Sequence, residues 1–289
     1  MRFIETTSRV SASLSQRGAE NESSALALSI VKCFAGIGAV RGFDWNKEVR
    51  IRRNYYDPSA KLQRFSPDDL SALLDVSISA EEIVARLEVI SATNEKFFRR
   101  LRAEIFLSMA AYEGKRYEAS FLHLYRAVEH LSVVLPFMYV QQEDRFEKGL
   151  EFLKGMIRKP RDGELAVLSS FMESGHPFSG LAGATITLAV EDDTPAVVSR
   201  VQNQFNTHLL KGELPTFDGV ANHVDVPIEE FHHLIITARN LMFHYTHGGD
   251  NFDTGYCGGA AFICRCLGEA GLTWFALFYV RVLGKLVTR

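Results

Sequence analysis

The chain has 289 residues, of which 47% are hydrophobic and 23% charged, which is the composition of a globular protein with a sizeable core. The formal net charge of -3 at pH 7 excludes a nucleic-acid binder that relies on bulk positive charge, so any basic surface has to be local. The first residues are polar and contain no apolar segment typical of a secretory signal. We therefore expect reduced thiols for the four cysteines and a cytoplasmic location.

Nearly every periodic segment of the chain predicts helix. The first predicted helix covers about residues 22–35, and a charged, irregular stretch follows to about residue 65. Ser66 is followed by acidic residues and is predicted to cap the next helix. The sequence SAEE at 79–82 is a capping-box pattern, which predicts the start of a helical region. This region is predicted to run, with a break, to about residue 112, and Glu113–Gly114 is predicted to form the turn that follows it.

A long helix is predicted at 116–135, where apolar and aromatic side chains recur every three or four residues and line one face. The sequence DRFEKGLEFLKGMI predicts a further short helix. Residues 159–226 are richer in glycine, proline and polar residues. We interpret them as an irregular insertion that contains one strand-like run, ATITLAV, and a helix near 196–211.

The next helix is predicted to begin at DVPIEEF, with Asp225 as its N-cap and Pro227 in its first turn. A final helix is predicted at about 257–286. Its apolar sequence invites a membrane interpretation, but it is interrupted by charged residues, namely Arg265, Glu269 and Arg281. Charges are costly in lipid, so we predict a helix that is buried in a protein core, and no membrane partner.

The predicted fold is therefore all-α, with long helices around an apolar core. Residues 1–75 are interpreted as an N-terminal helical extension, and residues 76–289 as a helical bundle that carries the insertion. The glycines of AGIGAVRG have the wrong spacing for a dinucleotide-binding loop, and DNFDTG lacks the ligands of a calcium loop. Cys264 and Cys266 point about 200° apart on a helix, so we predict core thiols. Neither a cofactor nor a metal is expected.

The stretch ITARNLMFHYTHGG places polar residues at the end of an apolar helix. Four residues separate Arg239 from His244, and Asn240 directly follows the arginine. Arg116 and His123 have a comparable spacing, so the spacing by itself identifies no site. The asparagine, the helix end and the glycine turn favour the first pair. The alternative is structural: the arginine pairs with a core carboxylate, and the histidine caps the helix C-terminus, where a cation is favoured.

This stretch resembles the R-x(4–6)-H signature of HEPN-domain ribonucleases, in which a polar residue commonly follows the arginine. The resemblance covers about 80–150 and 225–289, where AYEGKRYEASFLHLYRAVEHLSVVL also resembles a core helix of HEPN bundles. It implies metal-independent cleavage of RNA that leaves a cyclic phosphate and a 5′-hydroxyl, at a site shared across a homodimer. It also implies a toxin or antiviral defence effector with a neutralising or regulatory protein partner.

The residue types agree with this chemistry. RNA carries its own nucleophile, the 2′-hydroxyl, so the protein needs a histidine that exchanges a proton near neutral pH and an arginine that stabilises developing phosphate charge. In a continuous helix, Asn240 and His244 lie about 40° apart, whereas Arg239 and His244 lie about 140° apart. A dimer-shared site, a bent helix end or the length of the arginine would bring them together.

His247 and Glu129 are candidate auxiliary residues, the second acting from another core helix. The alternatives are a solvated turn histidine and an ordinary polar helix face. Candidate RNA-binding residues are Arg99, Arg100 and Arg102, together with the cluster KEVRIRRNYY, because basic side chains hold phosphates and aromatic ones stack on bases. The alternative function is a non-catalytic helical interaction module that docks to a partner protein.

Overall fold

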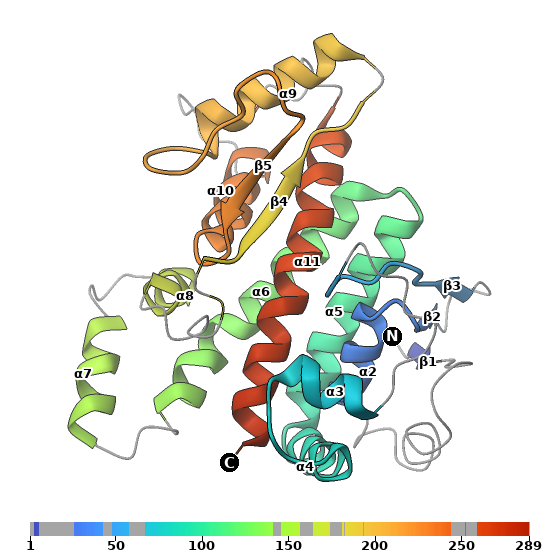
Figure 1. The fold of residues 1–289 in the computed structure, drawn as a ribbon, viewed down its shortest axis with the longest axis vertical. Helices are drawn as coiled ribbons and strands as arrows, with labels where there is room; N and C mark the ends of the chain where they lie inside the picture. Colours follow the sequence, from blue (N-terminus) through green and yellow to red (C-terminus); the bar gives the residue numbers. More distant parts are fainter. Residues whose placement is uncertain are drawn as a thin grey trace. The chain divides into compact units, whose positions relative to one another are not determined.

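Helices dominate the structure, a computed structural model shown in Figure 1. The structure describes residues 3–5, 26–42, 48–57, 67–140, 146–156, 164–173, 181, 183–192, 194–243, 252 and 259–288. Within this part of the chain there are ten helices, with 69% of the residues in helix and 7% in strand. The predicted all-α class is confirmed at this level.

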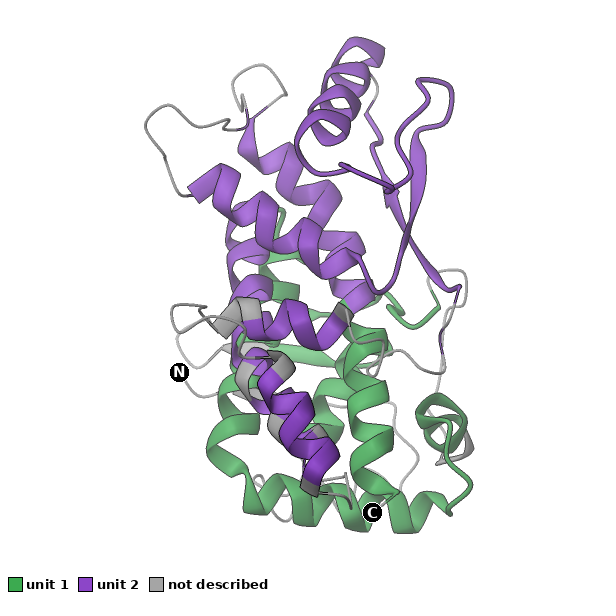
Figure 2. Cartoon of the chain, turned by 90° about the vertical axis from the view of Figure 1, so that its left-hand side faces the viewer, with its two compact units in different colours: residues 1–115, 275–289 green, residues 116–274 purple. Residues whose placement is uncertain are grey.

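The chain divides into two compact units, which Figure 2 shows in different colours. Unit 1 comprises residues 1–115 and 275–289, and unit 2 comprises residues 116–274. The last helix, α11 (Ala260–Val287), contributes residues to both units. The predicted domains, 1–75 and 76–289, divide the chain at a different place and stay a prediction.

Unit 1 is built on a fully buried helix. Its helices are α2 (Leu26–Phe34), α3 (Pro67–Leu74), α4 (Ala80–Thr93), α5 (Glu95–Glu113) and the C-terminal part of α11. All the residues of α2 are buried. Ser91 on α4 accepts a hydrogen bond from the Ala27 amide at 3.2 Å, and the Tyr279 hydroxyl donates to the Ala27 carbonyl at 3.2 Å. Helices α4 and α11 therefore both contact α2 through polar as well as apolar groups.

The predicted helix start at Ser79 is confirmed by its N-cap, whereas the Glu82 carboxylate of the predicted capping box pairs with Arg86 at 2.6 Å. The Ser79 hydroxyl oxygen accepts a hydrogen bond from the Glu82 amide at 3.2 Å, which satisfies one of the free amides of the first turn. Asn94 separates α4 from α5 at the predicted break, and Gly114 follows α5 at the predicted turn. Ser66, the predicted cap of α3, lies outside the described residues.

Three short antiparallel strands pair in the order β1 (Phe3–Glu5), β2 (Ala39–Gly42) and β3 (Glu48–Arg50). The prediction of an irregular stretch after the first helix is therefore wrong for β2 and β3. Strands this short contain too few residues to show an alternating pattern. The turn before β2 contains Gly36 at φ 75°, where a Cβ would lie 2.6 Å from the Arg53 carbonyl oxygen. Glycine is required there for both reasons.

Unit 2 is mostly helical. Its helices are α6 (Tyr117–Val140), α7 (Phe146–Met156), α8 (Glu164–Glu173), α9 (Pro195–His208), α10 (Phe231–Phe243) and the N-terminal part of α11. The predicted stripe on α6 is buried along most of its length, at Phe121, Leu124, Val128 and Leu131. Gly271 on α11 allows a close approach, because a Cβ there would lie 2.6 Å from Leu124 Cδ2 and 3.6 Å from Ile235 Cδ1.

Residues 159–226 are more regular than predicted. They contain α8, and they contain α9 close to the predicted helix. They also contain two antiparallel strands, β4 (Thr185–Ala189) and nearly all of β5 (His223–Pro227), which form a two-stranded sheet. The strand-like run ATITLAV is confirmed as β4, and the interpretation of the whole region as irregular is wrong.

Strand β5 also overturns the predicted start of the next helix. Asp225 and Pro227 lie in the strand, and α10 begins at Phe231. Val224 and Val226 are buried whereas Asp225 is exposed, which is the alternation of a half-buried strand. The Asp225 carboxylate accepts a hydrogen bond from the Thr187 hydroxyl at 2.7 Å across the sheet, a bond that replaces the predicted helix cap.

Helix α11 is long and apolar enough to cross a membrane by length and composition, and 67% of its most apolar window is buried in the structure. One of its charged residues, Arg281, forms an ion pair with Asp75 at 2.8 Å. Cys264 and Cys266 are both buried, so the prediction of core thiols is confirmed. Burial raises the pKa of each thiol to about 12, which keeps both protonated at neutral pH.

Candidate functional site on helices α6 and α10

Helix α10 presents a buried face and a polar face. Phe231, Leu234, Ile235 and Ala238 are fully buried, whereas Arg239 is half-buried and Asn240 is exposed. Arg239 and Asn240 lie near the last described residue of α10, Phe243. His244 and His247 lie outside the described residues, so the pairing of Arg239 with His244 stays a prediction.

The Arg239 guanidinium packs on the ring of Tyr125, a buried residue of α6. Its central carbon lies 4.8 Å from the ring centroid, which is a cation–π contact worth about 0.5–1 kcal/mol. One guanidinium N–H also donates to the Asn240 side-chain oxygen at 3.1 Å. These two contacts hold the guanidinium at one place, and they show what the asparagine after the arginine does in this chain.

Within the part of the chain that the structure describes, Arg239 forms no ion pair with a carboxylate. The alternative interpretation, in which the arginine pairs with a core carboxylate, therefore finds no partner among the described residues. An arginine has five N–H donors, and the contact with Asn240 uses one of them. The guanidinium can therefore still donate a two-pronged set of hydrogen bonds to a phosphate.

Glu129 belongs to the same cluster through Tyr125. The two residues lie one helical turn apart on α6, and the Tyr125 hydroxyl donates a hydrogen bond to the Glu129 carboxylate. Burial raises the pKa of Tyr125 to about 12, the hydrogen bond and charge of Glu129 act in the same direction, and the Arg239 charge opposes them. The tyrosine is therefore neutral at pH 7, with its hydroxyl toward the carboxylate and its ring against the arginine.

Tyr125 is the site residue that sequence reasoning missed. It lies one residue away from the predicted apolar stripe of α6, and its spacing of four to Glu129 was the signal that could have identified it. The structure joins Arg239, Asn240 and Glu129, all predicted from the sequence, through this unpredicted ring.

Apolar contacts fix the two helices that carry the cluster. The rings of Phe121 on α6 and Phe243 on α10 stack with centroids 6.5 Å apart. Between α10 and α11, the Cys264 thiol lies 3.7 Å from the Met242 sulfur. Arg239 and Tyr125 therefore project from backbones that are held by packing.

His232 on α10 is a structural residue. It is fully buried, and its Nδ1 lies 2.8 Å from the Glu229 carbonyl oxygen. Burial, with a smaller contribution from the charge of His233, lowers the pKa of His232 to about 3. A histidine that stays neutral across the physiological range cannot exchange protons there, so His232 is not a candidate acid or base.

The predicted RNA-binding arginines lie on α5 in unit 1 and do not share one face. Arg99 and Arg100 are exposed, and Arg99 forms an ion pair with Glu95 at 2.5 Å. Arg102 is only 5% exposed, and its guanidinium carbon lies 5.8 Å from the ring centroid of Phe106. Arg99 and Arg100 are thus exposed to solvent, whereas Arg102 packs against the helix, and RNA binding by these residues stays a prediction.

The aromatic residues of the cluster KEVRIRRNYY are also committed to packing. Tyr55 is fully buried and packs edge-on against the Phe34 ring at 6.0 Å. The Tyr56 hydroxyl donates to the Val31 carbonyl at 3.3 Å. These tyrosines anchor the chain to α2 and do not present their rings for stacking on bases.

Comparison with known protein families, with curated proteins and with solved structures found no match to this chain. The functional interpretation consequently rests on the arrangement of Arg239, Asn240, Tyr125 and Glu129 and on the sequence around them.

Proposed function

We propose that this chain is a metal-independent endoribonuclease that cleaves RNA through attack by the 2′-hydroxyl. The observation that carries the proposal is the Arg239 guanidinium, which is half-buried, fixed by Tyr125 and Asn240, and without a carboxylate partner in the described residues. A fixed, charged donor of this kind stabilises charge that develops on a phosphate in the transition state.

In the proposed reaction, His244 accepts the proton of the 2′-hydroxyl as its oxygen attacks phosphorus. Arg239 donates hydrogen bonds to the non-bridging oxygens as their negative charge increases. The bond to the 5′-oxygen then breaks, and this oxygen takes a proton from a histidine or from water. The products are a 2′,3′-cyclic phosphate and a 5′-hydroxyl, and no step uses a metal. His247 is proposed as an auxiliary residue, and Glu129 as the residue that orients Tyr125.

The proposal extends to the HEPN type of helical bundle, which is a finer statement than the all-α class. It includes a homodimer, because Arg239 and His244 would lie about 140° apart if the helix continued to His244, and a second copy can complete the site. It also includes a cytoplasmic toxin or antiviral defence effector, controlled by a neutralising or regulatory protein.

The test is cleavage of total RNA by the purified chain in the presence of EDTA. We expect cleavage that survives chelation, is lost in Arg239→Ala and His244→Ala, and leaves products with cyclic phosphate ends. Arg126→Ala and His223→Ala are matched controls, because both side chains are exposed in unit 2. Circular dichroism establishes that each variant is folded.

Two outcomes would reject the proposal. One is that the Arg239→Ala/His244→Ala double variant cleaves as fast as the parent. The other is that the parent cleaves no RNA, in which case the chain is the alternative, a non-catalytic module that docks to a partner protein.

A further inference from the structure

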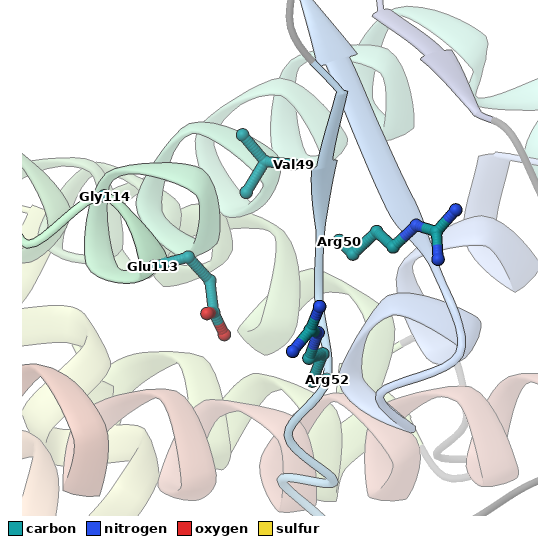
Figure 3. A pocket seen from close by; sticks show the side chains of 5 residues that line it. All are labelled: Val49, Arg50, Arg52, Glu113 and Gly114. Carbon is teal, nitrogen blue, oxygen red and sulfur yellow. The ribbon is translucent and has the colours of Figure 1, made fainter.

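A second polar region lies entirely in unit 1, at the edge strand β3. It is a surface pocket of about 700 Å³ lined by Val49, Arg50, Arg52, Glu113 and Gly114 (Figure 3). A volume of this size lies in the range of small-molecule sites. The lining comes from two places, the strand with the residues just after it and the C-terminal end of α5.

The backbone that carries the arginines is anchored independently of their side chains. The Ile51 amide donates to the Gly38 carbonyl at 3.0 Å, and the Tyr55 amide donates to the Phe34 carbonyl at 2.8 Å. Arg50 and Arg52 are exposed, and Arg52 makes no hydrogen bond or ion pair with any residue that the structure describes. Its guanidinium is therefore available to a ligand.

Glu113 stands on the opposite side of the pocket. Figure 3 shows the Glu113 and Arg52 side chains directed toward one another, whereas the Arg50 side chain extends away from Glu113. Burial raises the pKa of Glu113, and the charges of Arg52 and Arg53 oppose that shift. The carboxyl group is thus partly shielded from water, yet it has no ion-pair partner among the described residues. A ligand that donates a hydrogen bond to the Glu113 carboxyl and accepts hydrogen bonds from Arg52 would give both charged groups a partner.

We propose that this pocket binds a small phosphomonoester that also carries hydroxyl or amino donors, a nucleoside monophosphate being the class that fits. The phosphate lies on Arg52, because one guanidinium donates a pair of hydrogen bonds to phosphate oxygens. A sugar hydroxyl or a base amino group at the other end of the ligand donates to Glu113. Val49 contributes apolar surface along the ligand. This site lies outside the proposed ribonuclease site, so it does not depend on the proposed function.

The test is isothermal titration of the full-length chain with GMP, with inorganic phosphate and guanosine as separate arms. We expect GMP to bind, phosphate to compete with it, and guanosine to bind far more weakly. Arg52→Ala should weaken GMP binding by about tenfold or more, because it removes charged hydrogen bonds to the phosphate. Arg126→Ala, which removes an exposed arginine of unit 2, should leave the affinity unchanged.

Glu113→Gln separates the carboxyl group from the arginines. It removes a negative charge opposite the phosphate, so inorganic phosphate should bind more tightly to this variant than to the parent at pH 7.5. Arg52→Glu provides a second charge change at an exposed position, and GMP binding should be lost in this variant while its circular dichroism stays that of the parent.

Two results would overturn the proposal. They are the absence of GMP binding at millimolar concentration and GMP binding that is unaffected in folded Arg52→Glu. In the second case, a loss of affinity for single-stranded RNA in the same variant would identify Arg52 as part of an RNA contact surface instead.

Discussion

Arg239 in unit 2 and Arg52 in unit 1 are both candidate phosphate ligands, and the structure holds them in different ways. Arg239 is half-buried and restrained by the Tyr125 ring and the Asn240 side chain. Arg52 is exposed, and the group that faces it is the Glu113 carboxyl. A donor that stabilises a transition state has to be fixed before the reaction, whereas a donor for reversible binding can settle as the ligand arrives. The two proposals accordingly place RNA cleavage in unit 2 and reversible ligand binding in unit 1.

The largest expected effect is the pH dependence of stability that arises from the buried His232 in unit 2. His232 has a pKa of about 3 in the folded chain, below the value of about 6.5 for an unfolded histidine. The unfolded state therefore binds more protons between these two values, so stability falls as pH decreases from about 6.5 toward 3. Between pH 6.5 and 4 this group should lower the free energy of unfolding by about 3 kcal/mol.

Urea unfolding followed by tryptophan fluorescence checks this expectation. His232→Leu should be less stable than the parent at pH 7 but should lose about 3 kcal/mol less on acidification. His223→Leu, which replaces an exposed histidine of β5, should keep the parent's pH dependence. Equal pH slopes for the parent and His232→Leu would show that burial does not control this histidine.

The next largest effect is the loss of RNA cleavage when the restrained Arg239 is replaced. Arg239→Ala should slow RNA cleavage by about 10²–10³-fold, because it removes a fixed donor to the developing charge. Arg239→Lys keeps the charge but loses the planar fork and most of the contact with the Tyr125 ring, so it should also lose most of the activity. Single-turnover rates at saturating RNA measure both. A lysine variant with parental rate would show that charge alone suffices, and the contrast with Arg52 would disappear.

The comparison also shows which features the sequence could predict. Features set within one helix were predicted correctly, such as the Ser79 N-cap and the buried stripe of α6, because both depend on neighbours a few residues apart. The start of α10 was predicted wrongly. Asp225 followed by Pro227 is typical of a helix N-terminus, but both residues lie in strand β5 and the helix begins at Phe231. Cross-strand pairing with Thr187 decided that conformation, and no local pattern contains it.

In the candidate site too, features set by neighbouring residues could be predicted from the sequence, whereas contacts between distant segments could not. Asn240 was predicted as a site residue because it directly follows Arg239 in the chain, and the structure adds the hydrogen bond between the two side chains. Tyr125 was not predicted, because its contact with Arg239 joins two helices that are far apart in the sequence. The pocket at Glu113 was missed for the same reason, since the end of α5 and the strand β3 meet only in the folded chain.

A smaller effect is the loss of stability when a glycine of α11 is replaced by alanine. Each unit has one glycine of α11 at which an added Cβ would lie very close to another residue. A Cβ at Gly284 would lie 2.5 Å from the Leu74 backbone oxygen in unit 1, whereas a Cβ at Gly271 would lie 2.6 Å from the end of the Leu124 side chain in unit 2. The backbone at Leu74 cannot move aside as easily as the methyl group at the end of the Leu124 side chain. Gly284→Ala should therefore destabilise by about 2–3 kcal/mol and Gly271→Ala by about 1 kcal/mol.

Thermal unfolding of the two variants measures the difference. Gly149→Ala is the control, because its Cβ would make an ordinary contact of 3.5 Å with Val140 and alanine favours the helix. It should be neutral or slightly stabilising. A Gly271→Ala variant less stable than Gly284→Ala would show that the packing of unit 2 is the more rigid of the two.

The smallest effect concerns the hydroxyl of Tyr125. Tyr125→Phe keeps the ring under Arg239 and removes the hydrogen bond to Glu129, so RNA cleavage should fall only a few-fold, on the order of 1 kcal/mol. Tyr125→Leu also removes the cation–π contact and should reduce the rate further. Glu129→Gln tests the same bond from the other side. If Glu129 acts on the site only through Tyr125, the Tyr125→Phe/Glu129→Gln double variant should be no slower than the slower single variant, and a larger loss would give Glu129 a direct role of its own.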